Sequence, residues 1–423
     1  MRVRLRTGAW HEDAGIDLAF PPGWDVHVHR PRTPAPLTLH DISAAVRNPL
    51  AGPPLHELAV GMHRVAILVD DLTRPTPAAA ILPSIFTELV AAGVPASAVT
   101  ILLATGAHGG RVGEEALRAK LGAETMDRCR VVVHDHRAAT TYLGVTTYGT
   151  PVHLDCEIAG SDLVVGVGGV YPQHTVGFGG GAKIVLGALG TRSIAALHYG
   201  HPSGRGSYDV DNDFRRDVGE MAGMAGLRFG VLAHVDAQRA LVRVVAGEPV
   251  TLHGAEADYA RRTYLAPGPG DADLVVANAY PMDVSLTFAM SKGAIPLHHA
   301  RPGATRVLVA RCAEGLGRHD LFPLAPGPLD RLRQLRRKVS ADPAAAPGKA
   351  ISSLRRRLTA GEGHESAARP PILWYPGRPA DCSGVRGLVP VDRWADVLDR
   401  AAEGGGRTAV VYPCAPLQVL DLD

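Results

Sequence analysis

The chain has 423 residues, of which 46% are hydrophobic and 20% are charged, and its formal net charge is +2. This composition is typical of a globular protein of about two or three domains, and so small a charge gives no electrostatic case for binding nucleic acid. No apolar run approaches the ~20 residues of a membrane helix. The first residues lack the apolar segment of a signal peptide, and the cysteines form no C-x-x-C pair. We therefore expect a cytoplasmic protein without a membrane or nucleic-acid partner.

Strand-like and helix-like segments alternate from residue 64 onward, after a proline-rich start with one initial strand. Short apolar runs rich in β-branched residues predict strands buried on both faces, at 64–69, 99–104, 129–134 and 163–167. Apolar residues at helical spacing predict helices at 78–93, 113–121, 193–200, 209–226 and 251–262. Two further strands are expected at 227–234 and 241–246, either as a hairpin or as two separate short strands. This alternation predicts an α/β fold with a mainly parallel, Rossmann-like sheet.

A proline- and glycine-rich stretch at 265–271 is the candidate boundary between two α/β domains. We place the N-terminal domain at 1–268 and the C-terminal domain at 269–423, with the last residues able to pack back on the first domain. The second domain is expected to contain a helix at 285–293 and strands at 273–277, 306–310, 372–375 and 408–411. The basic residues of 329–360 are interpreted as solvated helix faces, with an anion-binding patch as the alternative.

Three loops follow strands of the first predicted sheet, and each carries polar or ionisable side chains: 70–75, 105–110 and 169–183. In parallel α/β sheets, ligands bind beyond the carboxyl ends of the strands. We therefore expect these three loops to converge on one site.

The histidines and the first loop leave alternatives open. Asp71 either caps the next helix with Arg74 as a surface partner, or orients Arg74 as a fork for a carboxylate or phosphate. His108 lies in the loop T-G-A-H-G-G, where an acid–base role is favoured over a structural one. His198 and His201 lack the glutamate and spacing of H-E-x-x-H. Ligation by a single histidine of a metal that another group already holds stays open.

A glycine turn at 177–181 comes two residues before Lys183. Glycine lets the backbone approach a ligand closely, and successive N–H groups can bind an anion. The turn is not a P-loop, because Lys183 is followed by Ile184 where a P-loop has serine or threonine. The residues alone indicate an α/β enzyme that acts on a small anion, with histidine acid–base chemistry and a lysine of special function.

Five features in this order resemble the lactate racemase family: D-D-L-T-R-P at 70–75, A-T-G-A-H-G at 104–109, the glycine turn with Lys183, the helix with His198, and E-G-L-G at 314–317. That family uses a nickel-pincer nucleotide. The resemblance implies that Lys183 is joined covalently to the cofactor and that His198 binds nickel, with His201 as the fallback. It also implies an active site in the cleft between the domains and transient contact with cofactor-assembly proteins. The other residues that it implies at the cofactor are Asp71, Leu72, Thr73 and Arg74.

The reaction implied by the resemblance is the racemisation or epimerisation of a 2-hydroxy acid through reversible hydride transfer. The substrate carboxylate would lie near Arg74 and Lys292. Acid–base chemistry would fall to His108 and to His174. Gln173, a further implied substrate contact, stands where the family has its second histidine, so which of Gln173 and His174 faces the substrate stays open. Ala289 stands where the family has a glutamine, which implies a substrate other than lactate. The oligomeric state stays open.

Two alternatives belong to other classes of protein. The glycine turn at 177–183 could serve a phosphate- or nucleotide-binding transferase, which would require magnesium. The chain could also be a non-catalytic binding protein for the cofactor or for a small acid. In that case the loss of His108 would leave ligand binding intact.

Overall fold

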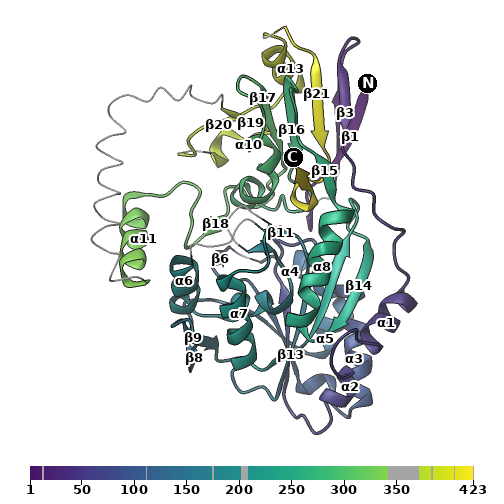
Figure 1. The fold of residues 1–423 in the computed structure, drawn as a ribbon, viewed down its shortest axis with the longest axis vertical. Helices are drawn as coiled ribbons and strands as arrows, with labels where there is room; N and C mark the ends of the chain where they lie inside the picture. Colours follow the sequence, from purple (N-terminus) through teal and green to yellow (C-terminus); the bar gives the residue numbers. More distant parts are fainter. Residues whose placement is uncertain are drawn as a thin grey trace.

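The computed structural model describes residues 1–11, 14–110, 112–173, 176–201, 208–341, 371–382, 384–403 and 405–422. Two six-stranded sheets form the two halves of the molecule, one above the other in Figure 1, and short strands lie where the halves meet. The predicted α/β fold is confirmed. Among the described residues, no helix is long and apolar enough to cross a membrane.

The first sheet has the strand order β14-β13-β10-β4-β5-β7 and is parallel except for β14, which runs antiparallel to β13. Its strands lie within two residues of the predicted positions, and the hairpin alternative for the last two is correct. They are β4 (Val65–Asp70), β5 (Val99–Ala104), β7 (Arg130–Val133), β10 (Leu163–Gly169), β13 (Leu227–Val235) and β14 (Leu241–Gly247).

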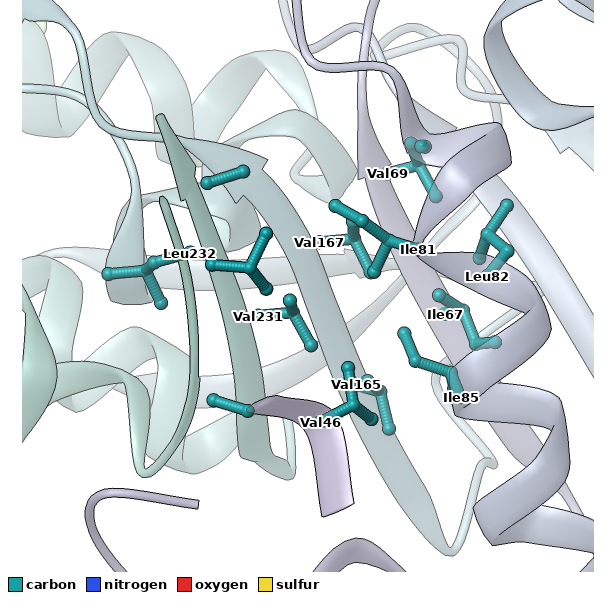
Figure 2. Packing of buried hydrophobic residues seen from close by; sticks show 14 of the residues in the cluster. Val46, Ile67, Val69, Ile81, Leu82, Ile85, Val165, Val167, Val231 and Leu232 are labelled. Atoms are coloured by element: carbon teal, nitrogen blue, oxygen red, sulfur yellow. The ribbon is translucent and has the colours of Figure 1, made fainter. Parts of the chain in front are cut away.

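Burial on both faces explains why the central strands are continuous apolar runs. Successive side chains of a strand point to opposite faces. In β4, Ile67 and Val69 pack into the core on one face, while Ala66 and Leu68 pack into the core on the other. Figure 2 shows Ile67 and Val69 beside Ile81, Leu82 and Ile85, which come from the helical segment that follows β4.

Two glycines of β10 make room for the segment that carries Lys183. That segment is the 3₁₀ helix η3 (Gly181–Ala188). A Cβ added at Gly166 would lie 2.9 Å from Cγ2 of Ile184, and one at Gly168 would lie 3.4 Å from an oxygen of Asp70. The absence of side chains on this face of β10 lets η3 lie directly against the sheet.

The second sheet has the order β20-β19-β17-β16-β21-β3, and all of its neighbouring strands are parallel. Four of its strands match the predictions for the second domain. The strands are β3 (Asp25–Val28), β16 (Leu274–Asn278), β17 (Thr305–Val309), β19 (Ile372–Tyr375), β20 (Leu388–Pro390) and β21 (Thr408–Tyr412).

The two ends of the chain cross between the halves. β3 belongs to the second sheet, and Phe20 packs on Trp394 with ring centroids 5.5 Å apart, so the assignment of residues near 1–28 to the N-terminal domain is wrong. β3 pairs with a strand near the other end of the chain, so the local sequence does not show which half the first residues join. Conversely, Leu417 and Val419 pack into the core of the first half, as β22 (Val419–Asp421) pairs with β15 (Leu265–Pro267).

The helices cover the sheets at close to their predicted positions. The expected helix at 285–293 is split into α9 (Leu286–Phe288) and a π turn, η4 (Ala289–Gly293). The basic segment is helical only to residue 341 within the described chain. The helices are α1 (Leu39–Arg47), α2 (Leu55–Leu58), α3 (Leu82–Ala91), α4 (Glu114–Leu121), α5 (Ala123–Arg128), α6 (Thr191–Gly200), α7 (Asp213–Met224), α8 (Pro249–Thr263), α9 (Leu286–Phe288), α10 (Ile295–His298), α11 (Pro328–Ala341) and α13 (Trp394–Ala402). The remaining short strands are β1 (Arg2–Thr7), β2 (Ala14–Ala19), β6 (His108–Gly109), β8 (Thr140–Val145), β9 (Pro151–Asp155), β11 (Pro172–Gln173), β12 (Gly177–Phe178) and β18 (Arg318–His319).

Candidate active site

A cavity of about 610 Å³ lies beyond the carboxyl ends of β4, β5 and β10. The three loops predicted to converge do so here. Residues of the second half, between 282 and 298 and between 319 and 324, line the cavity from the other side. Its lining includes seven of the residues singled out from the sequence: Asp71, Arg74, His108, Gln173, Lys183, His198 and Lys292.

Asp71 orients His108 rather than Arg74. Oδ2 of Asp71 lies 2.7 Å from Nδ1 of His108, and its side chain is only 6% exposed. Burial alone would raise the pKa of Asp71, but the neighbouring His108 and Arg74 and the hydroxyl of Thr73 hold it down at about 2. The carboxylate is therefore ionised and accepts the Nδ1 proton of His108. Nε2 of His108 is left as the nitrogen that can exchange a proton in the cavity.

The pKa of His108 reflects two opposing effects. Burial lowers the pKa, and the charge of Asp71 acts against burial. The balance is a pKa below the usual histidine value, so the ring is neutral at neutral pH. A neutral imidazole with a fixed Nδ1 proton suits a general base at Nε2.

Lys183 lies on the first turn of η3, two residues after Gly181, and the glycines at 180 and 181 both have left-handed backbone. Burial lowers the pKa of Lys183 to about 7, and the nearby Arg74 and Arg215 add to the effect. Among the described residues, none forms a hydrogen bond or an ion pair with this amine. The guanidinium of Arg215 is occupied by the turn itself, because it donates to the carbonyls of Phe178 and Gly180. Lys183 is therefore a partly neutral, nucleophilic amine that faces the cavity.

Arg74 and Lys292 approach the cavity from opposite halves. The guanidinium of Arg74 donates to Oγ1 of Thr73 at 2.8 Å, and its backbone carbonyl accepts hydrogen bonds from Trp10 and Lys120. Nζ of Lys292 donates to Oε1 of Gln173, which joins the two halves across the cavity. Burial and the neighbouring Arg74 and Lys183 lower the pKa of Lys292 well below the usual lysine value. The group of cations favours an anionic ligand.

The two candidate metal-binding histidines differ in position. His198 lines the cavity, and its Nδ1 donates to the carbonyl of Ile194 at 2.8 Å, which leaves the lone pair on Nε2. This hydrogen bond from Nδ1 sets the tautomer that a metal ligand requires. His201 is hydrogen-bonded to Asp217 at 2.7 Å, has a side chain 12% exposed, and does not line the cavity. Among the described residues, no three His, Cys, Asp or Glu side chains form a group that could hold a metal ion by themselves.

The other predicted site residues have different surroundings. Leu72 packs in an apolar cluster, and the Thr73 hydroxyl donates to Asp71, but neither lines the cavity. Asp71 also does not cap a helix, since it accepts from the backbone N–H of Thr73 in a local turn. His174 lies outside the described residues. Ala289 is fully buried in the core of the second half, so this position does not explain a change of substrate.

Sequence reasoning missed His319 and Phe288. The ring centroids of His319 and Phe288 lie 5.2 and 4.5 Å from that of His108. His319 follows the E-G-L-G turn by two residues, which was the available signal. Its contact with His108 depends on pairing between β6 and β18, which lie some two hundred residues apart and are only two residues long.

The fold and the cavity define an α/β protein with a site between two mainly parallel sheets, built around a histidine–carboxylate pair and a buried lysine. The family model of the lactate racemase N-terminal domain matches residues 11–205. The lactate racemase of Thermoanaerobacterium thermosaccharolyticum is 28% identical over 290 residues, which are 66% of this chain and 67% of that protein. The lactate racemase of Lactiplantibacillus plantarum is 26% identical over 290 residues, or 66% of this chain and 68% of that protein.

Two solved structures share the fold. The lactate racemase apoprotein from T. thermosaccharolyticum superposes with a TM-score of 0.71 at 21% identity, covering 99% of this chain and 100% of that one. A Thermotoga maritima protein superposes with a TM-score of 0.60 at 14% identity, covering 92% of this chain and all of that one. Residues 11–205 thus match the lactate racemase N-terminal domain by sequence, and the whole chain shares the fold of a lactate racemase.

Proposed function

We propose that this protein is an isomerase that racemises or epimerises a 2-hydroxy acid with a nickel-pincer nucleotide joined to Lys183. The observation that carries the proposal is the Lys183 amine, whose pKa is about 7 and which faces the cavity without a hydrogen-bond partner among the described residues. A lysine that served only as a phosphate cation would keep its charge. A partly neutral amine suits the formation of a covalent amide-like link.

The residues present fit this cofactor. Lys183 can hold it covalently, and Nε2 of His198 can complete the coordination of nickel. A single protein nitrogen is enough, because a pincer ligand supplies the other donors. When bound, the cofactor supplies a centre that takes the α-hydrogen of the substrate as hydride and returns it.

The chain's own residues bind the acid and move its hydroxyl proton. Arg74 and Lys292 bind the carboxylate, and Gln173 contacts the substrate beside Lys292. His108, held by Asp71, takes the hydroxyl proton at Nε2 as the substrate becomes a planar 2-oxo acid. The proposed acid–base group for the opposite enantiomer is His174.

The proposed substrate is a 2-hydroxy acid with a side group larger than the methyl group of lactate. Five of the apolar side chains that line the cavity would surround such a group: Phe288, Met290, Ile295, Phe322 and Leu324. Loading of Lys183 would need transient contact with cofactor-assembly proteins.

The test is expression with the cofactor-assembly enzymes, followed by intact mass and nickel content. We expect a lysine-dependent added mass and about one nickel per chain, both lost in Lys183→Ala and in Lys183→Arg, which keeps the positive charge. A wild-type protein without added mass or nickel would contradict the proposal. Single-enantiomer 2-hydroxy acids incubated in heavy water should then invert while largely keeping the α-hydrogen, whereas extensive deuterium at that carbon would indicate proton abstraction.

A further inference from the structure

His319 lies directly opposite the proposed general base. β18 pairs antiparallel with β6, and in this register His319 is the partner of His108. The two rings meet edge to face, with centroids 5.2 Å apart and an interplanar angle of 68°. Both side chains line the cavity, so a ligand between the halves meets two imidazoles side by side. Figure 1 shows β6 and β18 where the halves meet.

Backbone hydrogen bonds fix the tautomer of His319. The N–H groups of Leu321 and Phe322 both point at Nδ1 of His319, each at 3.3 Å. A backbone N–H only donates, so Nδ1 must carry the lone pair and the proton of the neutral ring must lie on Nε2. Among the residues that the structure describes, none accepts a hydrogen bond from that Nε2–H.

His319 also stays neutral. Burial lowers its pKa to about 2, and His108, His198, Lys292 and Arg74 all act in the same direction. No carboxylate is among the groups that act most strongly on the ring. An imidazole that neither gains a second proton nor offers Nε2 as an acceptor cannot be a general base at the substrate. It can still donate a hydrogen bond, as a neutral imidazole does when it polarises a carbonyl group.

The two rings offer complementary atoms. Nδ1–H of His108 donates a hydrogen bond to Asp71, so its Nε2 is an acceptor. Nδ1 of His319 accepts hydrogen bonds from two backbone N–H groups, so its Nε2 is a donor. A hydroxyl group has one proton to give and lone pairs to receive a hydrogen bond. One acceptor and one donor that face the same cavity therefore match a single hydroxyl oxygen.

We propose that His319 donates its Nε2–H to the substrate oxygen from which His108 removes the proton. This inference rests on the proposed function and adds a residue to it. The bond is made to the hydroxyl oxygen, strengthens as the proton leaves and negative charge develops, and persists on the keto oxygen of the 2-oxo acid. A fixed donor aimed at a developing oxyanion stabilises the transition state more than the ground state.

Two variants separate this role from a structural one. His319→Asn places an amide oxygen near the Nδ1 position, so it keeps the acceptor for the backbone N–H groups and loses the outer donor. His319→Gln places an amide N–H near the Nε2 position and loses the inner acceptor. We expect kcat/KM of the loaded enzyme to fall about 10²-fold in His319→Asn, because one oxyanion donor is typically worth about 10²–10³-fold. His319→Gln should stay within about tenfold of the wild type.

Two measurements do not depend on turnover. Histidine ¹⁵N spectra of the wild type should show His319 with a protonated Nε2 and an unprotonated Nδ1, without titration down to about pH 5. Calorimetric binding of the 2-oxo acid should weaken about tenfold or more in His319→Asn, while binding of a carboxylic acid without the 2-oxygen should not change.

The outcomes distinguish the inference from the proposed function. A wild type that inverts no 2-hydroxy acid contradicts the proposed function, and the spectra and the oxo-acid binding then still decide the donor role. An active wild type with an equally active His319→Asn and an impaired His319→Gln would show that His319 only holds its own turn. Loss of the low-pH limb of kcat/KM in both variants would instead make His319 a base, which also overturns the inference.

Discussion

Lys292 shares the cavity with Arg74 and Lys183, and burial together with these cations lowers its pKa well below the usual value. Its ammonium donates to an uncharged acceptor, Gln173, and to no carboxylate among the described residues. A substrate carboxylate would supply the missing negative charge and would raise the pKa of Lys292 again. Ligand binding and protonation of this lysine are therefore linked.

We expect binding of a 2-hydroxy acid to the loaded protein to take up protons. Between the pKa of Lys292 in the free and in the bound protein, affinity should fall as the pH rises, since the ligand favours the protonated lysine. Calorimetry in two buffers of different ionisation enthalpy measures the uptake. Lys292→Met should abolish it, and equal heats in the two buffers for the wild type would contradict this prediction.

Asp71→Asn tests the orientation of His108. The carboxylate fixes the Nδ1 proton and raises the pKa of His108 against the effect of burial, so its loss should lower both kcat and that pKa. We expect kcat to fall ~10²-fold or more, by analogy with other carboxylate–histidine pairs. The rise of kcat/KM with pH, which reports deprotonation of the base, should move to lower pH.

Asp25→Asn is the matched control for that variant, because Asp25 pairs with His27 at 3.0 Å on the exposed surface. It should leave the rate and the pH profile unchanged. If Asp71→Asn keeps the wild-type profile, Asp71 does not act through His108.

At the scale of elements, close contact between η3 and the end of β5 sets the distance between Lys183 and His108. Gly187 of η3 accepts a hydrogen bond from the N–H of Gly106 at 3.0 Å, and a Cβ at Gly187 would overlap the backbone of Ala104. The two segments that carry the lysine and the base therefore touch through their main chains. Any side chain at this point must push them apart.

Gly187→Ala should lower the free energy of unfolding by about 1–3 kcal/mol, the usual cost of overpacking, and should also reduce turnover. Gly254→Ala is the matched control, since Gly254 lies on the exposed face of α8 with no heavy atom near its added Cβ. It should stabilise the protein by about 0.5–1 kcal/mol through helix propensity. Urea unfolding measures both, and an unchanged midpoint for Gly187→Ala would show that the contact can relax.

The same scale explains what the sequence could predict. The strands β4, β5 and β10 and the loops after them follow from local patterns, because a doubly buried strand must be a continuous apolar run. β3 was missed because its four residues pair with a strand almost four hundred positions away. His319 was missed for the same reason, since nothing near it in the chain marks His108 as its neighbour.

At the scale of the whole molecule, Asp320 joins the two halves beside the cavity. It follows β18, its backbone N–H donates to the carbonyl of Ala107 at 2.9 Å, and its Oδ2 lies 2.7 Å from Nε2 of His136. The side chains of Asp320 and His136 are 6% and 5% exposed, while Arg137, which also reaches Oδ2, is half exposed. The segment that carries His319 is thus held on the first half by a buried carboxylate.

Asp320→Asn should loosen this junction and destabilise the protein by about 1–3 kcal/mol, because a charge-assisted buried hydrogen bond is weakened without leaving a second charge stranded. Burial alone would raise the pKa of Asp320, but His136, Arg137 and Arg318 lower it below the usual aspartate value. A carboxylate whose pKa is lower in the folded protein than in the unfolded chain stabilises the fold at pH values above the unfolded-state pKa of about 4. This stabilisation is lost as the pH falls through the folded-state pKa. The difference in the free energy of unfolding between the wild type and Asp320→Asn should therefore shrink below about pH 4.

Urea unfolding across this pH range and hydrogen exchange at residues 105–109 and 318–320 check the role of the junction. We expect faster exchange at both segments in Asp320→Asn and a higher KM, because β6 and β18 bring His108 and His319 together only while the halves are in contact. Asp330→Asn, which removes a partly exposed pair with Arg333 on α11, should change neither. Unchanged exchange at 105–109 in Asp320→Asn would show that the halves are held by other contacts, such as the hydrogen bond between Lys292 and Gln173.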